Sequence, residues 1–274
     1  MVENNQEQQI PGRQQFPVPD TGLYSFRNEH DACGVGLVAN LNNIAEHRIV
    51  EMGITVLKRL MHRGAAGGDP ETGDGAGILL ALPDKFFRKS LPVTLPAKGA
   101  YGVAMLFGGA HEESRIESIV TSEGGRILFW RDVPVHPESI GAAARKTCPL
   151  IRQIFIGRGP DVMVQTALER KLYVIRKTAS HRIQALKLTH GSEYFVPSMS
   201  TRTVVYKGLL LADQVGQYYL DLQNEKVESA IAVVHQRFST NTFPSWALAH
   251  PYRYIAHNGE INTVRGKNFW LRAR

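Results

Sequence analysis

Short apolar runs recur along this chain from residue 33 onward, and several of them begin or end beside glycine or proline. The clearest are CGVGLVA (33–39), GAGILLALP (75–83), YGVAMLFGG (101–109) and RILFWRDV (126–133). Short runs bounded by turn residues are typical of β-strands. Similar strand character continues in KLYVIRKTA (171–179), EYFVPSMSTRTVVYKGLLL (193–211), AIAVVHQRFS (230–239) and YRYIAHNGEI (252–261). A chain with so many short strands is expected to build layered sheets.

Helical spacing appears in other segments. Residues 47–63 place Val50, Ile54, Leu57 and Met61 three or four positions apart, and Gly64 follows as a suitable C-terminal residue. Residues 111–125 and 211–222 predict two further helices. Helices that punctuate many strands favour a layered domain with mostly antiparallel sheets.

The first 32 residues have almost no core-forming content, no apolar h-region and few arginines, which argues against a secretory or transit peptide. The folded part is therefore expected to begin at Cys33. The two cysteines, Cys33 and Cys148, provide neither a disulfide framework nor a metal-binding pair, so a reducing, cytoplasmic location is predicted without a metal site. No stretch approaches the length and apolarity of a membrane span.

The formal net charge of +7 invites a nucleic-acid hypothesis. The basic residues are spread along the chain, however, and no helix-turn-helix, zinc-finger or RNA-binding signature accompanies them. We interpret the charge as a solvated surface that attracts anionic small molecules or an acidic partner. A non-catalytic basic binding module stays open as an alternative.

Cys33 stands at the border between the leader and the first predicted strand, and Gly34 and Gly36 follow it. Glycines at these positions permit close approach of a ligand or another backbone segment. If the bond between Ala32 and Cys33 were cut, the cysteine would carry a free α-amino group. That amine, with a pKa of about 7.7–8.0, suits removal of the proton from a thiol of pKa about 8.5. A packed, non-catalytic cysteine is the alternative.

Two later motifs offer other groups that acyl transfer requires. In HQRFSTNTFPSW (235–246), Arg237 precedes hydroxyl and amide residues, an arrangement suited to gripping a carboxylate. In AHNGEINT (256–263), Asn258 and Gly259 form a turn whose side-chain amide and backbone N–H could converge on an oxyanion. A surface ion pair and an ordinary hairpin turn are the respective alternatives.

Two other residues receive a structural interpretation. Asp74, in TGDGAG, has neither a phosphate-loop pattern nor a second carboxylate at ligand spacing, so it is interpreted as a turn residue. Cys148 has no adjacent base and is interpreted as structural. The histidines are scattered singly, which favours ordinary packing or surface roles.

Together these blocks resemble the class II glutamine amidotransferase domain that begins the large subunit of glutamate synthase, an N-terminal-nucleophile hydrolase. The resemblance rests on CGVGLVAN, LKRLMHRGAAGGDPETGDGAGILLALP, STRTVVYKGLLLADQ and VVHQRFSTNTFPSWALAHPYRYIAHNGEINTVRG, in this order. It covers essentially the whole chain after the leader. It implies an α+β fold, the four-layer αββα sandwich, over residues 33–274, with residues 1–32 as a propeptide.

The resemblance also implies roles for individual residues. Cys33 matches the nucleophile, Arg237 and Thr240 match residues that bind the glutamine α-carboxylate, and Asn258 and Gly259 match the oxyanion hole. Several other residues match positions near the glutamine pocket or in supporting roles; they are His62, Arg63, Gly64, Ser239, Asn241 and His257.

An aspartate that holds the glutamine α-amino group follows the Asn-Gly pair by a few dozen residues in the family, which would place it beyond Arg274. The resemblance therefore predicts that this sequence is a piece of a longer protein and lacks a full glutamine site. It also implies that FMN and an iron–sulfur cluster belong to downstream domains, where ammonia is used for reductive amination of 2-oxoglutarate in nitrogen assimilation.

The partners implied are L-glutamine, the remaining domains of the same polypeptide, and either ferredoxin or a small NAD(P)H-oxidising subunit; neither nucleic acid nor a membrane is expected. An N-terminal-nucleophile acylase with another amide substrate stays open as an alternative function. The Arg237 motif favours an amino-acid substrate over other amides.

Overall fold

Two four-stranded antiparallel sheets form the centre of the protein. The computed structural model describes residues 33–108, 112–162, 164–185, 194–239, 242–257 and 264–274. The first sheet has the order β1 (Gly34–Ala39), β8 (Ile231–Gln236), β2 (Ala76–Ala81) and β7 (Thr203–Gly208). The second has the order β4 (Arg126–Asp132), β5 (Ile151–Gly157), β3 (Tyr101–Phe107) and β6 (Phe195–Ser200).

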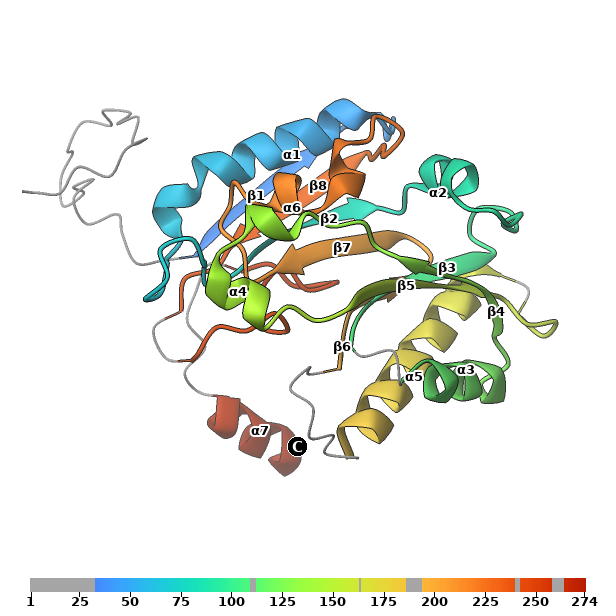
Figure 1. The fold of residues 1–274 in the computed structure, drawn as a ribbon. Coiled ribbons are helices and arrows are strands. Elements are labelled where there is room, and N and C mark those ends of the chain that lie inside the picture. The colour runs from blue at the N-terminus through green and yellow to red at the C-terminus, as the bar shows by residue number, and fades with distance from the viewer. Residues whose placement is uncertain (1–32, 109–111, 163, 186–193, 240–241, 258–263) are drawn as a thin grey trace, which may run out of the picture.

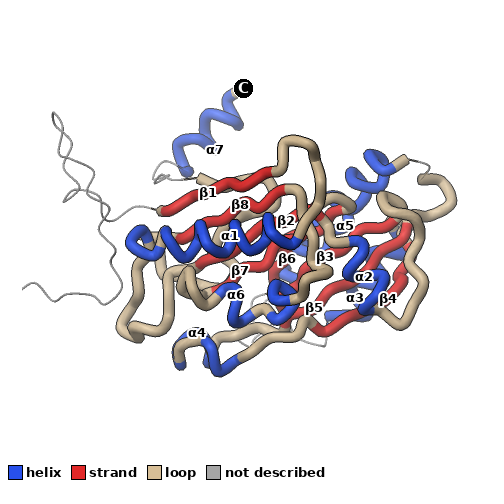
Figure 2. Tube along the Cα trace, turned by 90° about the horizontal axis from the view of Figure 1, so that it is seen from above, coloured by secondary structure: helices blue, strands red, loops and turns tan. Residues whose placement is uncertain are grey.

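Helices cover the outer sides of both sheets. Figure 1 shows α1 (His47–Arg59) above the first sheet, and α3 (Glu113–Ser122) and α5 (Gln165–Ala185) below the second. Seen from above, α1 lies across the first sheet (Figure 2). The α+β, four-layer αββα fold implied by the family resemblance is therefore confirmed. The shorter helices are α2 (Asp84–Ser90), α4 (Ala142–Lys146), α6 (Val215–Tyr218), α7 (Val264–Ala273) and 3-10 turns at Met61–Arg63, Pro137–Ser139 and Leu220–Gln223.

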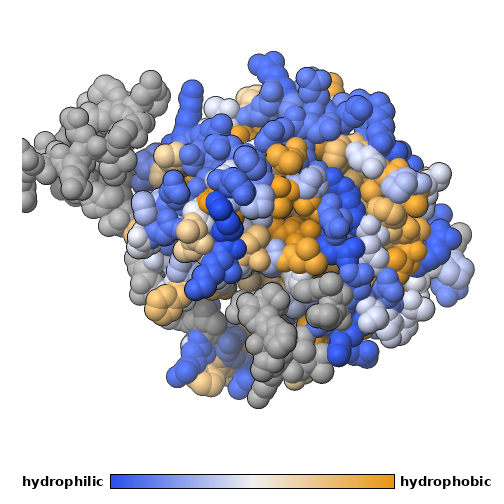
Figure 3. Space-filling model, in the orientation of Figure 1, coloured by the Kyte–Doolittle hydropathy of each residue, from blue (hydrophilic) through white to orange (hydrophobic). Residues whose placement is uncertain are grey.

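Burial follows the periodicity of each element. In α1, Ile49, Val50, Gly53 and Leu57 are buried and form one stripe against the first sheet. The whole of β3 is buried, which explains why its sequence is a continuous apolar run. Figure 3 shows apolar residues in the middle and on the right of the face seen in Figure 1, with hydrophilic residues around and between them. This pattern is expected where a layered core is viewed from its edge.

Most predicted elements are confirmed, and four predictions need correction. The helix predicted over residues 211–222 is reduced to α6 and the 3-10 turn at Leu220–Gln223. The segment 171–179 was expected to be a strand, but it lies within α5. The segment 252–261 was also expected to be a strand; its described part, 252–257, contains only an isolated bridge between Tyr252 and Ile255. The helix predicted over residues 47–63 ends at Arg59 and continues as a 3-10 turn.

Gly64 is not a left-handed helix cap, because its φ of −100° and ψ of 163° are extended. A side chain there would collide with Gln236, since a Cβ would lie 2.2 Å from the Gln236 amide nitrogen. Close packing against β8 therefore explains this glycine. Within the described ranges, no helix is long and apolar enough to cross a membrane.

Candidate active site

The starts of β1 and β2 and the end of β8 lie side by side because these strands are antiparallel neighbours. Gln236 pairs with Gly34 on one side and with Ala76 on the other. Cys33, Asp74 and Arg237 each lie just outside one of these strand ends. The register of the sheet therefore brings three distant parts of the sequence to one place.

The Cys33 sulfur faces the backbone that follows β8. The Phe238 N–H donates toward Sγ at a nitrogen-to-sulfur distance of 3.5 Å, and Sγ lies 3.6 Å from the Phe238 carbonyl oxygen. Cys33 is only partly buried. The thiol is therefore held against the Phe238 backbone, directly after Arg237, and is not fully buried.

The glycines after Cys33 allow close packing of side chains, whereas the sequence predicted the approach of a ligand or another backbone segment. A Cβ on Gly34 would lie 3.1 Å from Cβ atoms of Leu60 and Arg63. One on Gly36 would lie 2.4 Å from a Val56 methyl group. The His62-Arg63-Gly64 motif thus packs beside the residue that follows Cys33.

Arg237 is almost completely buried, at 8% exposure, rather than forming the surface ion pair considered as an alternative. Its Nη2 donates to Ser239 Oγ at 3.0 Å and to Thr242 Oγ1 at 2.7 Å, and its Nη1 donates to the Asp74 carbonyl at 3.2 Å. These contacts are all to neutral oxygens. A buried cation whose hydrogen-bond partners are neutral suits the binding of an anionic ligand group, and the nearby Asp74 carboxylate offsets only part of its charge.

Asp74 has a larger role than its interpretation as a turn residue suggested. It is 5% exposed, and its Oδ2 accepts a hydrogen bond of 2.7 Å from the Ser239 backbone N–H. Burial raises the pKa of Asp74, and the Ser239 N–H and the Arg237 charge partly offset that effect. The flanking glycines in TGDGAG were the available sequence signal.

Three residues expected in the site cannot be placed. Thr240, Asn258 and Gly259 lie outside the described residues, as does the supporting residue Asn241. Their roles in carboxylate binding and oxyanion stabilisation stay predictions.

The residue immediately before Asn258 is described, and it belongs to a histidine cluster that scattered sequence positions did not reveal. His235 Nε2 lies 2.8 Å from the His257 carbonyl oxygen. The His235 and His250 rings stack at 4.5 Å, and His250 and His257 lie 4.9 Å apart. Burial, with the neighbouring positive groups, lowers the pKa of His235 to about 4 and that of His250 to about 3. Both imidazoles are therefore neutral near pH 7.

Lys207, on β7, contacts the loop that contains His250. It is fully buried, and its Nζ donates to the carbonyls of Ala247 at 2.9 Å and Ala249 at 2.6 Å. The ammonium also lies over the rings of Phe195 and Tyr252, at 4.6 Å and 4.1 Å. Burial lowers the Lys207 pKa well below its ordinary value. This side chain fixes the backbone that leads to His250.

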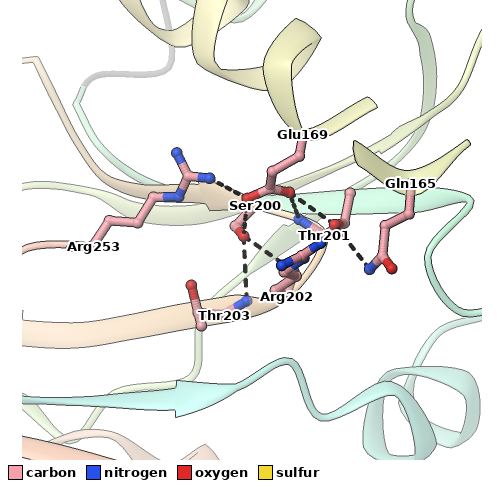
Figure 4. Close-up of polar contacts among 7 residues, drawn as sticks. All are labelled: Gln165, Glu169, Ser200, Thr201, Arg202, Thr203 and Arg253. Carbon is pink, nitrogen blue, oxygen red and sulfur yellow. Dashed lines mark hydrogen bonds and ion pairs between the residues drawn. The ribbon is translucent and has the colours of Figure 1, made fainter. Parts of the chain in front are cut away.

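Glu169 contacts a later part of the loop that contains His250, at Arg253. Figure 4 shows its carboxylate, on α5, between Arg253 and the turn that joins β6 to β7. It accepts hydrogen bonds from Ser200 Oγ at 2.6 Å, from the Thr201 N–H at 2.7 Å and from Thr201 Oγ1 at 2.8 Å, and it forms an ion pair with Arg253. Gln165 donates to Thr201 Oγ1 at 3.1 Å. The network ties helix, turn and loop together.

Metal binding and the second cysteine were also considered in the sequence. In the part of the chain that the structure describes, no group of three or more His, Cys, Asp or Glu is arranged to hold a metal ion. Cys148 Sγ lies 3.0 Å from the Tyr218 hydroxyl, and burial raises the pKa of its thiol. An inert, structural Cys148 agrees with the sequence interpretation.

Comparison with known proteins shows which family the chain resembles. The family model for class II glutamine amidotransferases matches residues 33–274, and the match begins at Cys33. The glutamate synthase [NADPH] large chain of Bacillus subtilis is 50% identical over 260 residues, which are 92% of this chain and 17% of that protein.

Other relatives carry different electron donors in their names. The ferredoxin-dependent glutamate synthase 1 of Arabidopsis thaliana is 40% identical over 261 residues, or 92% of this chain and 16% of its own length. The glutamate synthase [NADH] of Saccharomyces cerevisiae is 40% identical over an alignment of 277 positions, which covers 94% of this chain and 13% of that protein. The chain thus spans a small part of the relatives it matches. By its family match over most of its length, it belongs to the class II glutamine amidotransferases.

Proposed function

We propose that this chain supplies the glutamine-hydrolysing part of the whole protein, converting L-glutamine to glutamate and ammonia with Cys33 as the nucleophile after removal of residues 1–32. The observation that carries the proposal is the β1–β8 register, which pairs Gly34 with Gln236 and so sets Cys33 beside Arg237. A thiol and a buried guanidinium at one sheet end suit an amide substrate that carries a carboxylate. The domain boundary at residue 33 is part of the proposal.

The reaction follows from the groups that Cys33 would supply. Its free α-amino group takes the thiol proton, and the thiolate attacks the side-chain amide carbon of glutamine. Asn258 and Gly259 stabilise the resulting oxyanion; removing one such donor typically costs about 2.7–4 kcal/mol of barrier stabilisation. The ammonium formed on Cys33 then protonates the leaving nitrogen, which departs as ammonia. Water hydrolyses the remaining γ-glutamyl thioester and restores the thiol.

Arg237 and Thr240 would bind the α-carboxylate of glutamine. Support comes from the burial of Arg237 and from its hydrogen bonds to Ser239 and Thr242, which hold the guanidinium in one orientation. A fixed planar fork pairs well with a carboxylate. This preference for an amino-acid substrate favours glutaminase chemistry over an acylase with another amide substrate.

In the whole protein, we infer that the ammonia serves a glutamate synthase centre that reductively aminates 2-oxoglutarate. The relatives named as glutamate synthases support this inference. FMN and an iron–sulfur cluster would belong to other domains. The present sequence does not fit a cysteine-ligated cluster, because it has only two cysteines. Ferredoxin or a pyridine-nucleotide-oxidising subunit would supply electrons, and the cytoplasm is the expected location.

A glutamine analogue with an electrophilic diazoketone tests the assignment. The leader-free protein should be labelled at Cys33 alone, as located by peptide mapping, and excess glutamine should protect it. Cys148→Ser serves as the matched control and should label normally, whereas Cys33→Ala should neither label nor turn over glutamine. Full turnover by Cys33→Ala, or labelling of protein that retains residue 32, would refute the mechanism. Labelling by a different amide analogue without protection by glutamine would favour an acylase.

A further inference from the structure

Asp74 is buried at the candidate site but has no part in the chemistry proposed above. Its own backbone is fixed on both sides: its N–H donates to the Ala65 carbonyl at 3.0 Å, and its carbonyl accepts from Arg237 Nη1 at 3.2 Å. Its carboxylate accepts from the Ser239 N–H at 2.7 Å. One residue therefore contacts both the guanidinium of Arg237 and the backbone two positions later.

The segment that carries Asp74 has little freedom to move. Gly75 has a φ of +133°, a conformation that favours glycine, and a Cβ there would lie 2.9 Å from that of Ala249. A Cβ on Gly73 would lie 2.5 Å from the Leu210 carbonyl oxygen. Both glycines allow the backbone on either side of Asp74 to pack directly against other segments. The carboxylate is thus presented from a rigid frame.

Phe238 lies between the two residues that this frame holds. On one side, the Arg237 N–H donates to the Gly75 carbonyl at 2.7 Å. On the other side, the Ser239 N–H donates to the Asp74 carboxylate. The backbone of Phe238, which contacts the Cys33 sulfur through its N–H and its carbonyl, is therefore clamped at both ends.

We propose that Asp74 is a positioning residue for the nucleophile: its carboxylate holds the Ser239 N–H and so orients the Phe238 peptide against the Cys33 sulfur. The inference rests on the proposed function, because it concerns the same nucleophile. Asp74 does not touch the substrate in this scheme. Its negative charge also lies near the Arg237 guanidinium, where it offsets part of the positive charge offered to a substrate carboxylate.

The two properties of Asp74, hydrogen-bond acceptor and charge, can be separated by substitution. Asp74→Asn keeps an oxygen at the same distance from the backbone and removes the charge. It should retain kcat within a few-fold, and its KM for glutamine should stay the same or fall because Arg237 then faces the substrate without a competing carboxylate. Asp74→Ala removes the acceptor. Its kcat should fall by about 10- to 100-fold, the scale of a misplacement near 1 Å.

The test measures steady-state glutamine hydrolysis by the whole protein after removal of residues 1–32. Asp69→Ala is the matched control, because Asp69 also accepts backbone and hydroxyl hydrogen bonds in the preceding loop, from Ala143, Glu71 and Thr72, without contacting the site. It should alter thermal stability while leaving kcat within about twofold. Loss of kcat in Asp74→Ala, with recovery in Asp74→Asn, supports a positioning role that general destabilisation does not explain.

Asp74→Glu keeps the charge but displaces the oxygen by one methylene, and it provides the test if Asp74→Ala does not fold. Its kcat should also fall by at least tenfold. Unchanged kcat in Asp74→Ala or Asp74→Glu, in protein whose hydrolysis depends on Cys33, overturns this inference and leaves the proposed function intact. Hydrolysis that survives Cys33→Ala, or is absent from the unsubstituted protein, overturns the proposed function and this inference together.

Discussion

The ion pair between Glu169 and Arg253 provides a direct test of how the fold holds the segment that leads to Asn258. Arg253 lies in that segment, and Glu169 lies on α5. Their side chains are only 7% and 13% exposed, for Arg253 and Glu169 respectively. Replacing either residue alone leaves a charge buried without its partner, which is the costly way to break such a pair.

The expected magnitude follows from the contacts of Glu169. Removing one partner of a buried pair costs about 3–5 kcal/mol, and hydrogen bonds to a charged group contribute about 1.5–3 kcal/mol each without being additive. Arg253→Met should therefore lower the free energy of unfolding by about 3 kcal/mol. Glu169→Gln should lower it by a similar amount, because the amide retains only part of the acceptor capacity used by Ser200 and Thr201. The double variant should lose clearly less free energy of unfolding than the two single variants lose when their losses are added.

Urea unfolding of the two single variants and the double variant yields the coupling energy, which should be about 2 kcal/mol. Lys85→Met is the control, because the Lys85–Glu228 pair has side chains 59% and 26% exposed and such pairs contribute about 0–1 kcal/mol. A coupling energy below about 0.5 kcal/mol would show that Glu169 and Arg253 act independently. That result would refute the tie between α5 and the loop.

The pH dependence of this contribution has a definite sign. Burial raises the pKa of Glu169, but the hydrogen bonds from Ser200 and Thr201 and the charge of Arg253 outweigh it, so the pKa in the folded chain lies below its ordinary value. The stabilisation is therefore present above the unfolded-state pKa of about 4.3 and is lost as pH falls through the folded value. Glu169→Gln should flatten the acid side of the stability profile.

Three further predictions concern the site and its supports. Arg237→Lys should raise the KM for glutamine by about 10- to 100-fold, the loss of one charge-assisted hydrogen bond, and an unchanged KM would remove Arg237 from the carboxylate site. Because the folded-state pKa values of His235 and His250 lie below the unfolded value of about 6.5, urea midpoints should fall as pH is lowered from 7 to 5, and His250→Gln should reduce this slope. Gly36→Ala should destabilise the protein by about 1–3 kcal/mol in urea unfolding through collision with Val56, whereas full stability would mean that α1 can move away.

The sequence located most strands but misassigned the centre of α5. The reason is that residues 171–179 were considered without the rest of the helix. Residues 171–179 contain Tyr173, Val174 and Ile175, a run typical of strands. Over the whole helix, the buried side chains recur every three or four residues, at Leu168, Leu172, Ile175, Ala179 and Ile183. Tyr173 and Val174 are 48% and 42% exposed, so their strand propensity is overridden by the helical stripe that packs on the second sheet.

In the candidate site, the sequence predicted individual residues but missed groups that meet only in the folded chain. Cys33 and Arg237 were identified from local chemistry and from the family resemblance. Their proximity depends on the strand register that pairs Gly34 with Gln236 and brings Cys33 into contact with Phe238, 205 positions later. The His235, His250 and His257 cluster has no local period at all, since a strand, a loop and the end of that loop each supply one ring. Such groups meet only through tertiary packing, which a single sequence does not encode in any short pattern.

The TGDGAG motif shows why closely packed glycines are easier to recognise in a sequence than a buried polar residue such as Asp74. Its glycines are recognisable because close packing excludes every other side chain: Gly73 faces Leu210, Gly75 faces Ala249, and Gly77 would place a Cβ 2.6 Å from the His250 carbonyl oxygen. Asp74 lies between them, and only those glycines mark it in the sequence, because its partner Ser239 lies far along the chain. The glycines of TGDGAG show where chain segments pack closely. Asp74, which they enclose, makes the hydrogen bond that holds Ser239 at this point of contact.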